Sequence, residues 1–180
     1  MEVALELTPV SLVQAARDGD ADAFARLVAP ELAPALGAAV LVIGSRADAA
    51  DAVQEALVSA WRGLGGLREP DAFPAWFRRH VVRAAMRLAK RQRAWQPLED
   101  ADAAMSQLGG LESALAHRQL DRAFGTLTPA DRLLLTLHFH WNQPVAETAA
   151  TLGIPTGTVK SRVHHAVRRL RAAYDAEERA

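Results

Sequence analysis

The clearest alternation of apolar and polar positions lies in residues 143–171. Its first part predicts a helix from three apolar residues that share one face: Val145, Ala149 and Leu152. Gly153 follows where a sharp turn between two helices requires a positive φ. Pro155 suits the first position of the next helix, because its missing N–H costs nothing there. That second helix is predicted from apolar residues at helical spacing: Val159, Val163, Val167 and Leu170.

The outward face of the second helix carries small polar and basic side chains. Every charged residue between Glu147 and Asp175 is basic, whereas a solvated face normally mixes both signs. A helix with an apolar back and a basic front, entered through a tight turn, is what reading the major groove of DNA requires. An ordinary helical hairpin with a solvated face is the alternative. The predicted DNA-binding residues are Thr156, Thr158, Lys160, Ser161, Arg162, His164, His165 and Arg168.

The rest of the chain also shows helical patterns and no strand pattern, which predicts an all-α fold. Helices are expected over residues 9–17, 20–43, 49–64, 73–93, 111–127 and 133–141. Thr8, Asp20 and Thr128 suit N-cap positions. Pro30 and Pro34 each remove a hydrogen bond inside a helix, so a kink or a break is expected near residues 29–34. The very apolar residues that follow, 35–43, are expected at the centre of the core.

A change in composition divides the chain into two units. Residues 95–110 contain Pro97, an acidic cluster and the pair Gly109-Gly110, and their periodicity is weak. This stretch predicts a flexible linker between two small helical domains, at residues 8–94 and 111–176.

Composition excludes several classes of chemistry. The 180 residues include no cysteine, so disulfides, thiolate catalysis and the usual structural zinc sites do not arise. The acidic N-terminus does not resemble a signal peptide, and the longest apolar run, Ala38–Ile43, is too short to span a bilayer. We therefore expect a cytoplasmic protein with no membrane insertion of its own.

Net charge is zero, but the charges are unevenly distributed. A second basic block lies between Asp71 and Glu99, with no acid inside it, and Trp76 precedes its first arginine. This helix either covers a core edge with long side chains or grips a nucleic-acid backbone with an aromatic side chain near unpaired bases. The candidates for the second role are Trp76, Arg78, Arg79, Arg83 and Arg87.

No arrangement of a catalytic or metal site stands out. His138 and His140 point to different faces of a helix, as do the adjacent His164 and His165, so neither pair has chelating spacing. The glycines at 63–66 lack the lysine that follows them in a phosphate loop. The sequence predicts neither an enzyme nor a cofactor.

The order of these features resembles a known family. An all-α unit containing Asp51-Ala52-Val53-Gln54-Glu55, a basic helix beginning at Phe73, an acidic linker and Leu152-Gly153-Ile154-Pro155-Thr156-Gly157-Thr158-Val159-Lys160-Ser161-Arg162 follow one another. This is similar to extracytoplasmic-function (ECF) sigma factors of the sigma-70 family, which keep only regions 2 and 4.

The resemblance implies a role for each part. The helix at residues 49–64 would dock on the β′ clamp of core RNA polymerase, and the basic helix of region 2 would open and read the −10 promoter element. The second helix of the helix-turn-helix in region 4 would read the −35 element, and an anti-sigma factor is an expected partner. The polymerase-binding residues implied are Asp51, Val53, Gln54 and Glu55.

Two other functions remain open. A stand-alone helix-turn-helix regulator would bind duplex DNA without polymerase, but would leave the helix at residues 49–64 and the second basic block without a purpose. An adaptor that binds no DNA and only sequesters a partner is the other alternative.

Overall fold

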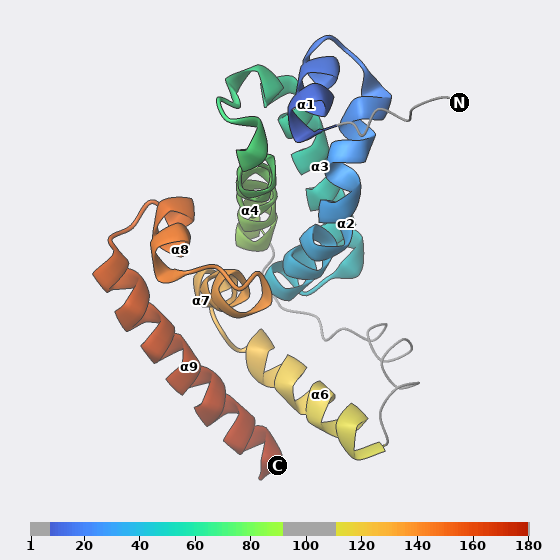
Figure 1. Cartoon of the computed structure of the whole chain (residues 1–180). Coiled ribbons are helices and arrows are strands. Elements are labelled where there is room, and N and C mark those ends of the chain that lie inside the picture. Colours follow the sequence, from blue (N-terminus) through green and yellow to red (C-terminus); the bar gives the residue numbers. More distant parts are fainter. Residues whose placement is uncertain (1–7, 92–110, 180) are drawn as a thin grey trace.

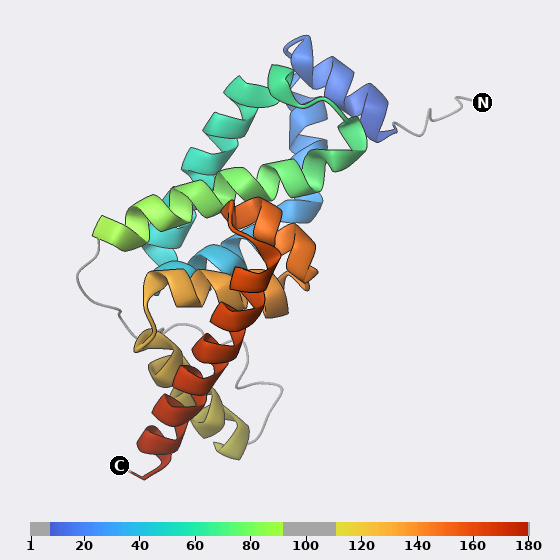
Figure 2. The same cartoon turned by 90° about the vertical axis from the view of Figure 1, so that its left-hand side faces the viewer.

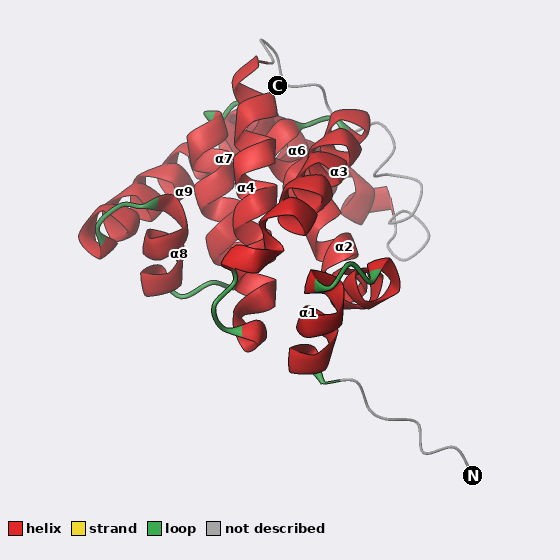
Figure 3. Ribbon diagram, turned by 90° about the horizontal axis from the view of Figure 1, so that it is seen from above, coloured by secondary structure: helices red, strands yellow, loops and turns green. Residues whose placement is uncertain are grey.

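The computed structural model describes residues 8–91 and 111–179. Over these residues every regular element is a helix, which confirms the all-α prediction (Figure 3). The predicted linker at residues 95–110 and the basic Arg93 lie outside the described residues. We call residues 8–91 the N-terminal unit and residues 111–179 the C-terminal unit.

The first two helices begin at the predicted caps. Helix α1 (Pro9–Arg17) starts after Thr8, whose hydroxyl accepts the N–H of Ser11, and helix α2 (Ala21–Ile43) starts after Asp20, whose carboxylate accepts the N–H groups of Asp22 and Ala23. Between them Gly19 adopts a φ of +99°, which turns the chain.

Helix α2 continues through Pro30 and Pro34, so the alternative of a break at residues 29–34 is wrong, and a kink there stays a prediction. Burial on both sides of the prolines favours the continuous helix: Phe24, Leu27 and Val28 are buried before them, and residues 35–43 carry most of the buried positions after them. The segment at residues 35–43 is therefore central to the core, as expected. Helix α2 is also long and apolar enough to cross a membrane, a property that core helices of globular proteins share.

The N-terminal unit is completed by α3 (Arg46–Gly63), two short 3₁₀ turns (Leu64–Gly66 and Pro70–Ala72) and α4 (Phe73–Arg91). Ser45 caps α3 by accepting the N–H of Asp48. Helix α4 packs on α3 and α2 through Phe73 and Phe77, whose stacked rings are 2% or less exposed. A large aromatic and aliphatic core therefore fixes the rotation of α4 about its axis.

The C-terminal unit consists of α6 (Leu111–Gly125), α7 (Pro129–Leu135), one π-helical turn (Thr136–His140), α8 (Val145–Leu152) and α9 (Thr156–Glu178). Thr128 caps α7 as predicted, with Pro129 in the first helical turn. The long helix α9 packs on α6, α7 and α8 through small apolar clusters. Buried helix was expected up to Trp141, but Phe139 in the π-helical turn is 62% exposed.

The two units are packed together. Helix α7 lies between α2 and α4 on one side and α6 and α9 on the other (Figures 1 and 2). Leu133, Leu137 and Trp141 of the C-terminal unit belong to the same hydrophobic cluster as the core of the N-terminal unit. The sequence predicted two separate cores, and this shared one was not anticipated.

Candidate nucleic-acid interface

The turn between α8 and α9 sets the direction in which α9 leaves the C-terminal unit. Gly153 adopts the left-handed conformation with a φ of +67°, and the N–H of Ile154 donates to the carbonyl of Ala149. Pro155 then occupies the N-cap, one position earlier than predicted, with an extended backbone. The helix-turn-helix predicted for residues 143–171 is confirmed in its order and in its glycine turn.

The buried stripe of α9 is made by Val159 and Ala166, both fully buried, with Val163 and Leu170 beside them. Val167 is 36% exposed, so its predicted place in the stripe is wrong. The reason is helical geometry: a residue eight positions on is rotated by about 80°, whereas one seven positions on is rotated by only about 20°.

The predicted DNA-binding residues of α9 lie on one helix and, Thr158 apart, all are exposed. At about 100° per residue, Ser161, His164 and Arg168 follow the centre of the face opposite Val159 and Ala166. Lys160 lies on one flank of this face, and Arg162 lies on the other. The side chains at the centre of this exposed face are therefore flanked by basic residues on both sides.

The flank with Arg162 faces the N-terminal unit. Arg162, His165 and Arg169 line a hollow of about 450 Å³ together with Met86 of α4 and Asp131 and Leu133 of α7. We call it the α4–α9 hollow. The edge of α9 that carries Arg162 therefore faces the other basic helix, α4, across this hollow.

Arg169 forms an ion pair within the protein, with Asp131 of α7. Its guanidinium lies 2.8 Å from Oδ1 of Asp131, and the hydroxyl of the N-cap Thr128 donates to Oδ2 of the same carboxylate at 2.9 Å. This network ties α9 to the start of α7. Arg168, the next residue toward the N-terminus, remains on the outward face.

The basic side chains of α4 divide into two groups. Arg79, Arg83 and Arg87 recur every four residues and are exposed, and Trp76 lies partly buried beside them. The guanidinium of Arg87 forms an ion pair with Glu55 of α3, and both side chains are about half exposed. These four residues form the exposed face of α4.

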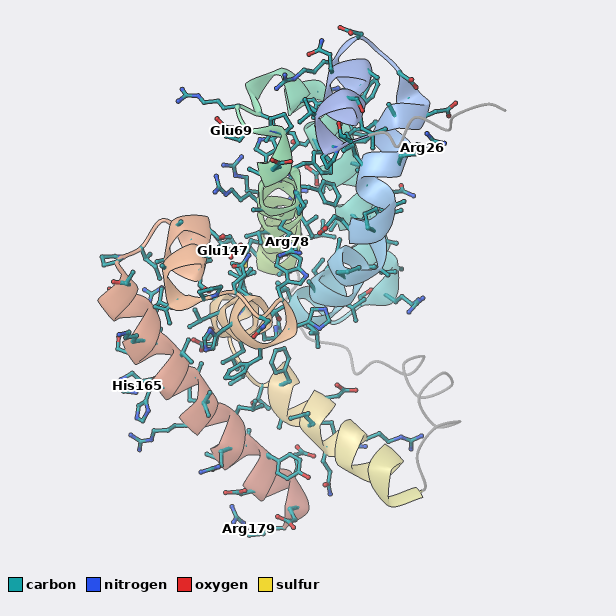
Figure 4. All side chains as sticks on the ribbon, viewed as in Figure 1. Arg26, Glu69, Arg78, Glu147, His165 and Arg179 are labelled. Atoms are coloured by element: carbon teal, nitrogen blue, oxygen red, sulfur yellow. The ribbon has the colours of Figure 1, made fainter. Side chains whose placement is uncertain are left out.

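Arg78 lies on the other side of α4 and has partners within the protein, so its role in DNA binding stays a prediction. Its Nε is 3.2 Å from Glu31 of α2, and its guanidinium carbon is 5.7 Å from the ring centroid of Trp141. Figure 4 shows it between α4 and α2, next to α7. A residue one position from Arg79 is rotated by about 100°, which takes it off the exposed face.

Behind Trp76 lies His80, which the sequence did not single out. The two rings meet edge to face with centroids 4.3 Å apart, and His80 Nδ1 is 2.8 Å from the hydroxyl of Ser59 on α3. Burial, and secondarily the positive charge of Arg83, lower the pKa of His80 below 6.5. The position of His80 four residues after Trp76 was the available signal, since such residues share a helix face.

The predicted polymerase-binding residues also divide. Asp51, Gln54 and Glu55 share the exposed face of α3. Val53 is only 7% exposed and packs into the core with Ala49, Ala52 and Ala56, so its inclusion was wrong. Val58, three residues after Glu55 and 49% exposed, supplies the apolar side chain that this face presents.

Among the described residues, no group of His, Cys, Asp and Glu side chains could hold a metal ion.

Two family models match the chain: Sigma-70 region 2 over residues 27–95, and Sigma-70 region 4 over residues 123–172. Both of the basic helices described above fall within these matches, except for the last turns of α9.

Related proteins are similar over much of their length. The chain is 30% identical over 175 residues to the ECF RNA polymerase sigma-E factor of Escherichia coli, which covers 89% of the chain and 91% of that protein. It is 36% identical over 125 residues to the ECF RNA polymerase sigma factor SigM of Mycobacterium tuberculosis, a match that covers 68% of the chain but only 62% of the relative.

Solved structures share the fold. CnrH, solved in complex with the cytosolic domain of CnrY, superposes with a TM-score of 0.67 at 29% identity, over 92% of this chain and 96% of CnrH. The sigma factor RpoE of Bartonella quintana, solved with the anti-sigma factor NepR, superposes with a TM-score of 0.66 at 22% identity, over 84% of this chain and 96% of RpoE. With its helix-turn-helix in region 4, its basic helix in region 2 and relatives that match it nearly end to end, the chain belongs to the ECF sigma factors of RNA polymerase.

Proposed function

We propose that the protein is a promoter-specificity subunit that acts in the cytoplasm. It binds core RNA polymerase through the β′ clamp, reads the −35 element with α9 and captures the −10 element with α4. The polymerase carries out the synthesis, and the protein contributes sequence reading and binding energy.

The outward face of α9 is the observation that supports this function best. Ser161, His164 and Arg168 stand opposite its buried stripe, and every charged residue from 156 to 171 is basic. A helix with such a face fits the major groove, which is about 12 Å wide and admits one helix. The first two turns of α9 after the glycine turn keep their outward side exposed, and these turns are where base contacts of helix-turn-helix proteins are made.

The −10 element would be captured by the exposed face of α4. Arg79 and Arg83 are placed for phosphates, and Trp76 offers a partly exposed indole on which an unpaired base can stack, a contact worth about 1–3 kcal/mol. His80 and Ser59 hold the indole from behind. Arg78 would join this surface only after leaving Glu31 and Trp141.

The polymerase would contact the exposed face of α3. Asp51, Gln54 and Glu55 provide acidic and amide groups, and Val58 provides an apolar contact between them and the next turn. A mixed patch of this kind, with an apolar centre and a polar rim, is typical of protein interfaces.

Transcription in vitro tests the proposal. Core polymerase supplemented with this protein should initiate at a defined subset of promoters in a genomic library, and core polymerase alone should not. Failure to initiate anywhere would refute the sigma-factor activity. Retention of core polymerase on the immobilised protein separates this function from that of a stand-alone regulator, and it should be lost in Glu55→Arg and kept in Arg46→Glu, which changes an exposed charge at the start of the same helix.

An anti-sigma partner is also proposed. The two solved relatives were each captured with a partner protein, and one of these partners is named as an anti-sigma factor. Copurification from the native source, followed by identification of the bound chain, tests this. A protein that copurifies and does not lower transcription in vitro would speak against the assignment.

A further inference from the structure

Helix α1 packs against the segment that joins α3 to α4, residues 64–72, which we call the α3–α4 loop (Figure 1). In the last turn of α1, Nε of Arg17 donates to the carbonyl of Leu64 at 3.4 Å, and its Nη2 donates to the carbonyl of Leu67. The N–H of Leu67 itself donates to the carbonyl of Leu64 and closes a 3₁₀ turn between the two leucines. One guanidinium therefore bridges both ends of this turn.

The middle of the turn consists of two glycines, Gly65 and Gly66. A Cβ built on either glycine would meet no atom within 4 Å, so no close packing dictates their conformation. Glycine has the widest choice of backbone conformations, and two in succession give the chain many alternatives to the observed turn. The side chains of Leu64 and Leu67 are 2% and 3% exposed and fix the ends of the turn in the core. The two hydrogen bonds of Arg17 then favour one conformation of the backbone between them.

The shape of the guanidinium suits arginine to this bridge. Its N–H groups point outward from a rigid plane, so Nε and Nη2 of Arg17 reach two acceptors at the same time in fixed directions. Lysine carries the same charge but places all of its donors on one nitrogen at the end of a flexible chain. A lysine at position 17 would therefore keep the charge and lose the bridge.

The residues on both sides of the α3–α4 loop lie against Trp76. Just before the loop, a Cβ built on Gly63 would lie 3.6 Å from Cζ2 of the indole. Just after it, the ring centroid of Phe73 is 6.0 Å from that of Trp76. Arg68 and Glu69, within the loop, are exposed. A change in the conformation of the loop therefore alters the surroundings of the indole that is proposed to stack on an unpaired base.

We propose that Arg17 is a positioning residue: by bridging the carbonyls of Leu64 and Leu67, it holds the α3–α4 loop in the conformation in which Trp76 captures an unpaired base of the −10 element. The effect on base capture rests on the proposed function, whereas the anchoring of the loop does not. Apparent affinity equals the intrinsic affinity multiplied by the fraction of molecules in the competent conformation. If loss of the bridge lowers this fraction from nearly one to about one tenth, binding weakens about tenfold.

The first measurement is hydrogen exchange at the amide of Leu67 in the full chain, because this N–H closes the turn. R17Q and R17K should both raise its exchange rate about tenfold, since exchange follows local opening. The amide of Ala49, which donates to Ser45 at the start of α3, should keep its parent rate and so shows that the unit stays folded. R26Q, which removes a charge from an exposed position of α2, should change neither amide. An unchanged Leu67 rate in folded R17Q would overturn the anchor.

The second measurement uses each variant assembled with core polymerase. The probes are two forms of a promoter found by transcription from the genomic library. One is a fork whose −10 element is single-stranded, and the other is a duplex that ends upstream of the −10 element. R17Q and R17K should bind the fork about tenfold more weakly than the parent and bind the duplex equally well. R26Q should match the parent on both probes.

The lysine variant separates positioning from charge. Fork binding that R17K keeps and R17Q loses would overturn the positioning role, because Arg17 would then act as a charge near phosphate. Faster exchange at Leu67 with unchanged fork binding would overturn the role of the loop in base capture. If the parent protein initiates at no promoter, the proposed function and the role in base capture are both refuted, and the exchange rates alone decide whether Arg17 anchors the loop.

Discussion

The two basic helices, α4 and α9, carry similar charges on very different supports. Helix α4 crosses a large core in which Phe73 and Phe77 stack, whereas α9 rests on two small clusters of apolar residues around Val159 and Ala166. The exposed cations of α4 recur every four residues along one line, and those of α9 surround its outward half. The comparison shows that a helix can present basic side chains on a core of either size. The large core beneath α4 determines which side of that helix is exposed, whereas the small clusters beneath α9 leave most of its circumference exposed.

The largest expected effect is a loss of folding stability, and it compares the core beneath α4 with the clusters beneath α9. Val81→Ala removes two methyl groups from the large core beneath α4 and should lower the free energy of unfolding by about 3 kcal/mol. Val159→Ala removes the same two groups from an equally buried position of α9 and should cost only about 2 kcal/mol, because the smaller cluster around it can close over part of the space. Urea unfolding followed by circular dichroism measures both. Equal losses would contradict the idea that the two helices have supports of different depth.

Features that depend on residues close together in the sequence were predicted correctly, whereas contacts between residues far apart in the sequence were missed. Thr8, Asp20 and Thr128 were identified as caps because a cap depends on residues within one turn. The exposed residues of α9 followed from one helical period. The pairing of Arg78 with Glu31 was not foreseen, because a run of arginines in the sequence does not show which one meets an acid from another helix.

The docking of Trp141 could not have been predicted from the pattern either. An apolar residue near the end of a helix has the same signature whether it completes its own unit or a neighbouring one. Pro34 was noted as an irregular residue in an apolar helix, and Gly37 was not singled out. Their use, as an acceptor for an indole and as a place for a histidine ring, depends on a chain segment about a hundred residues away.

The next effect sharpens the difference between positions on α9. Lys160→Ala should change which −35 sequence is preferred, with a loss of about 1–3 kcal/mol at the base pair it contacts. Arg168→Ala should weaken binding to all sequences alike, because a phosphate contact carries no sequence information. Binding to a set of duplexes with single base-pair changes separates the two. A uniform loss in both variants would make Lys160 a phosphate contact.

A smaller effect distinguishes two neighbouring arginines. Arg168→Ala should reduce the slope of log K against log salt by about 0.9, the value for one phosphate contact. Arg169→Ala should leave that slope unchanged and lower stability by up to about 1 kcal/mol, because Arg169 pairs with Asp131 at the surface. If Arg169→Ala reduces the salt slope as well, then the ion pair opens when DNA binds.

The smallest expected effect is a dependence of region 2 stability on pH, caused by His80, whose ring packs against Trp76. Since burial and Arg83 lower the pKa of His80 below 6.5, the folded protein favours the neutral ring, and the unfolded chain binds more protons once the pH falls below 6.5. Stability should therefore be fully retained above pH 6.5 and decline as the pH falls through the folded pKa. His80→Gln should flatten this decline, while Arg79→Gln, which changes the exposed residue next to it in the chain, should preserve it. Because His80 supports the indole from α4 and accepts or donates at Ser59 on α3, protonation should loosen Trp76 before it unfolds the unit. Trp76 fluorescence, measured with the other tryptophans replaced by phenylalanine, should then change at a higher pH than the helical signal, and coincident changes would show that His80 acts only through global stability.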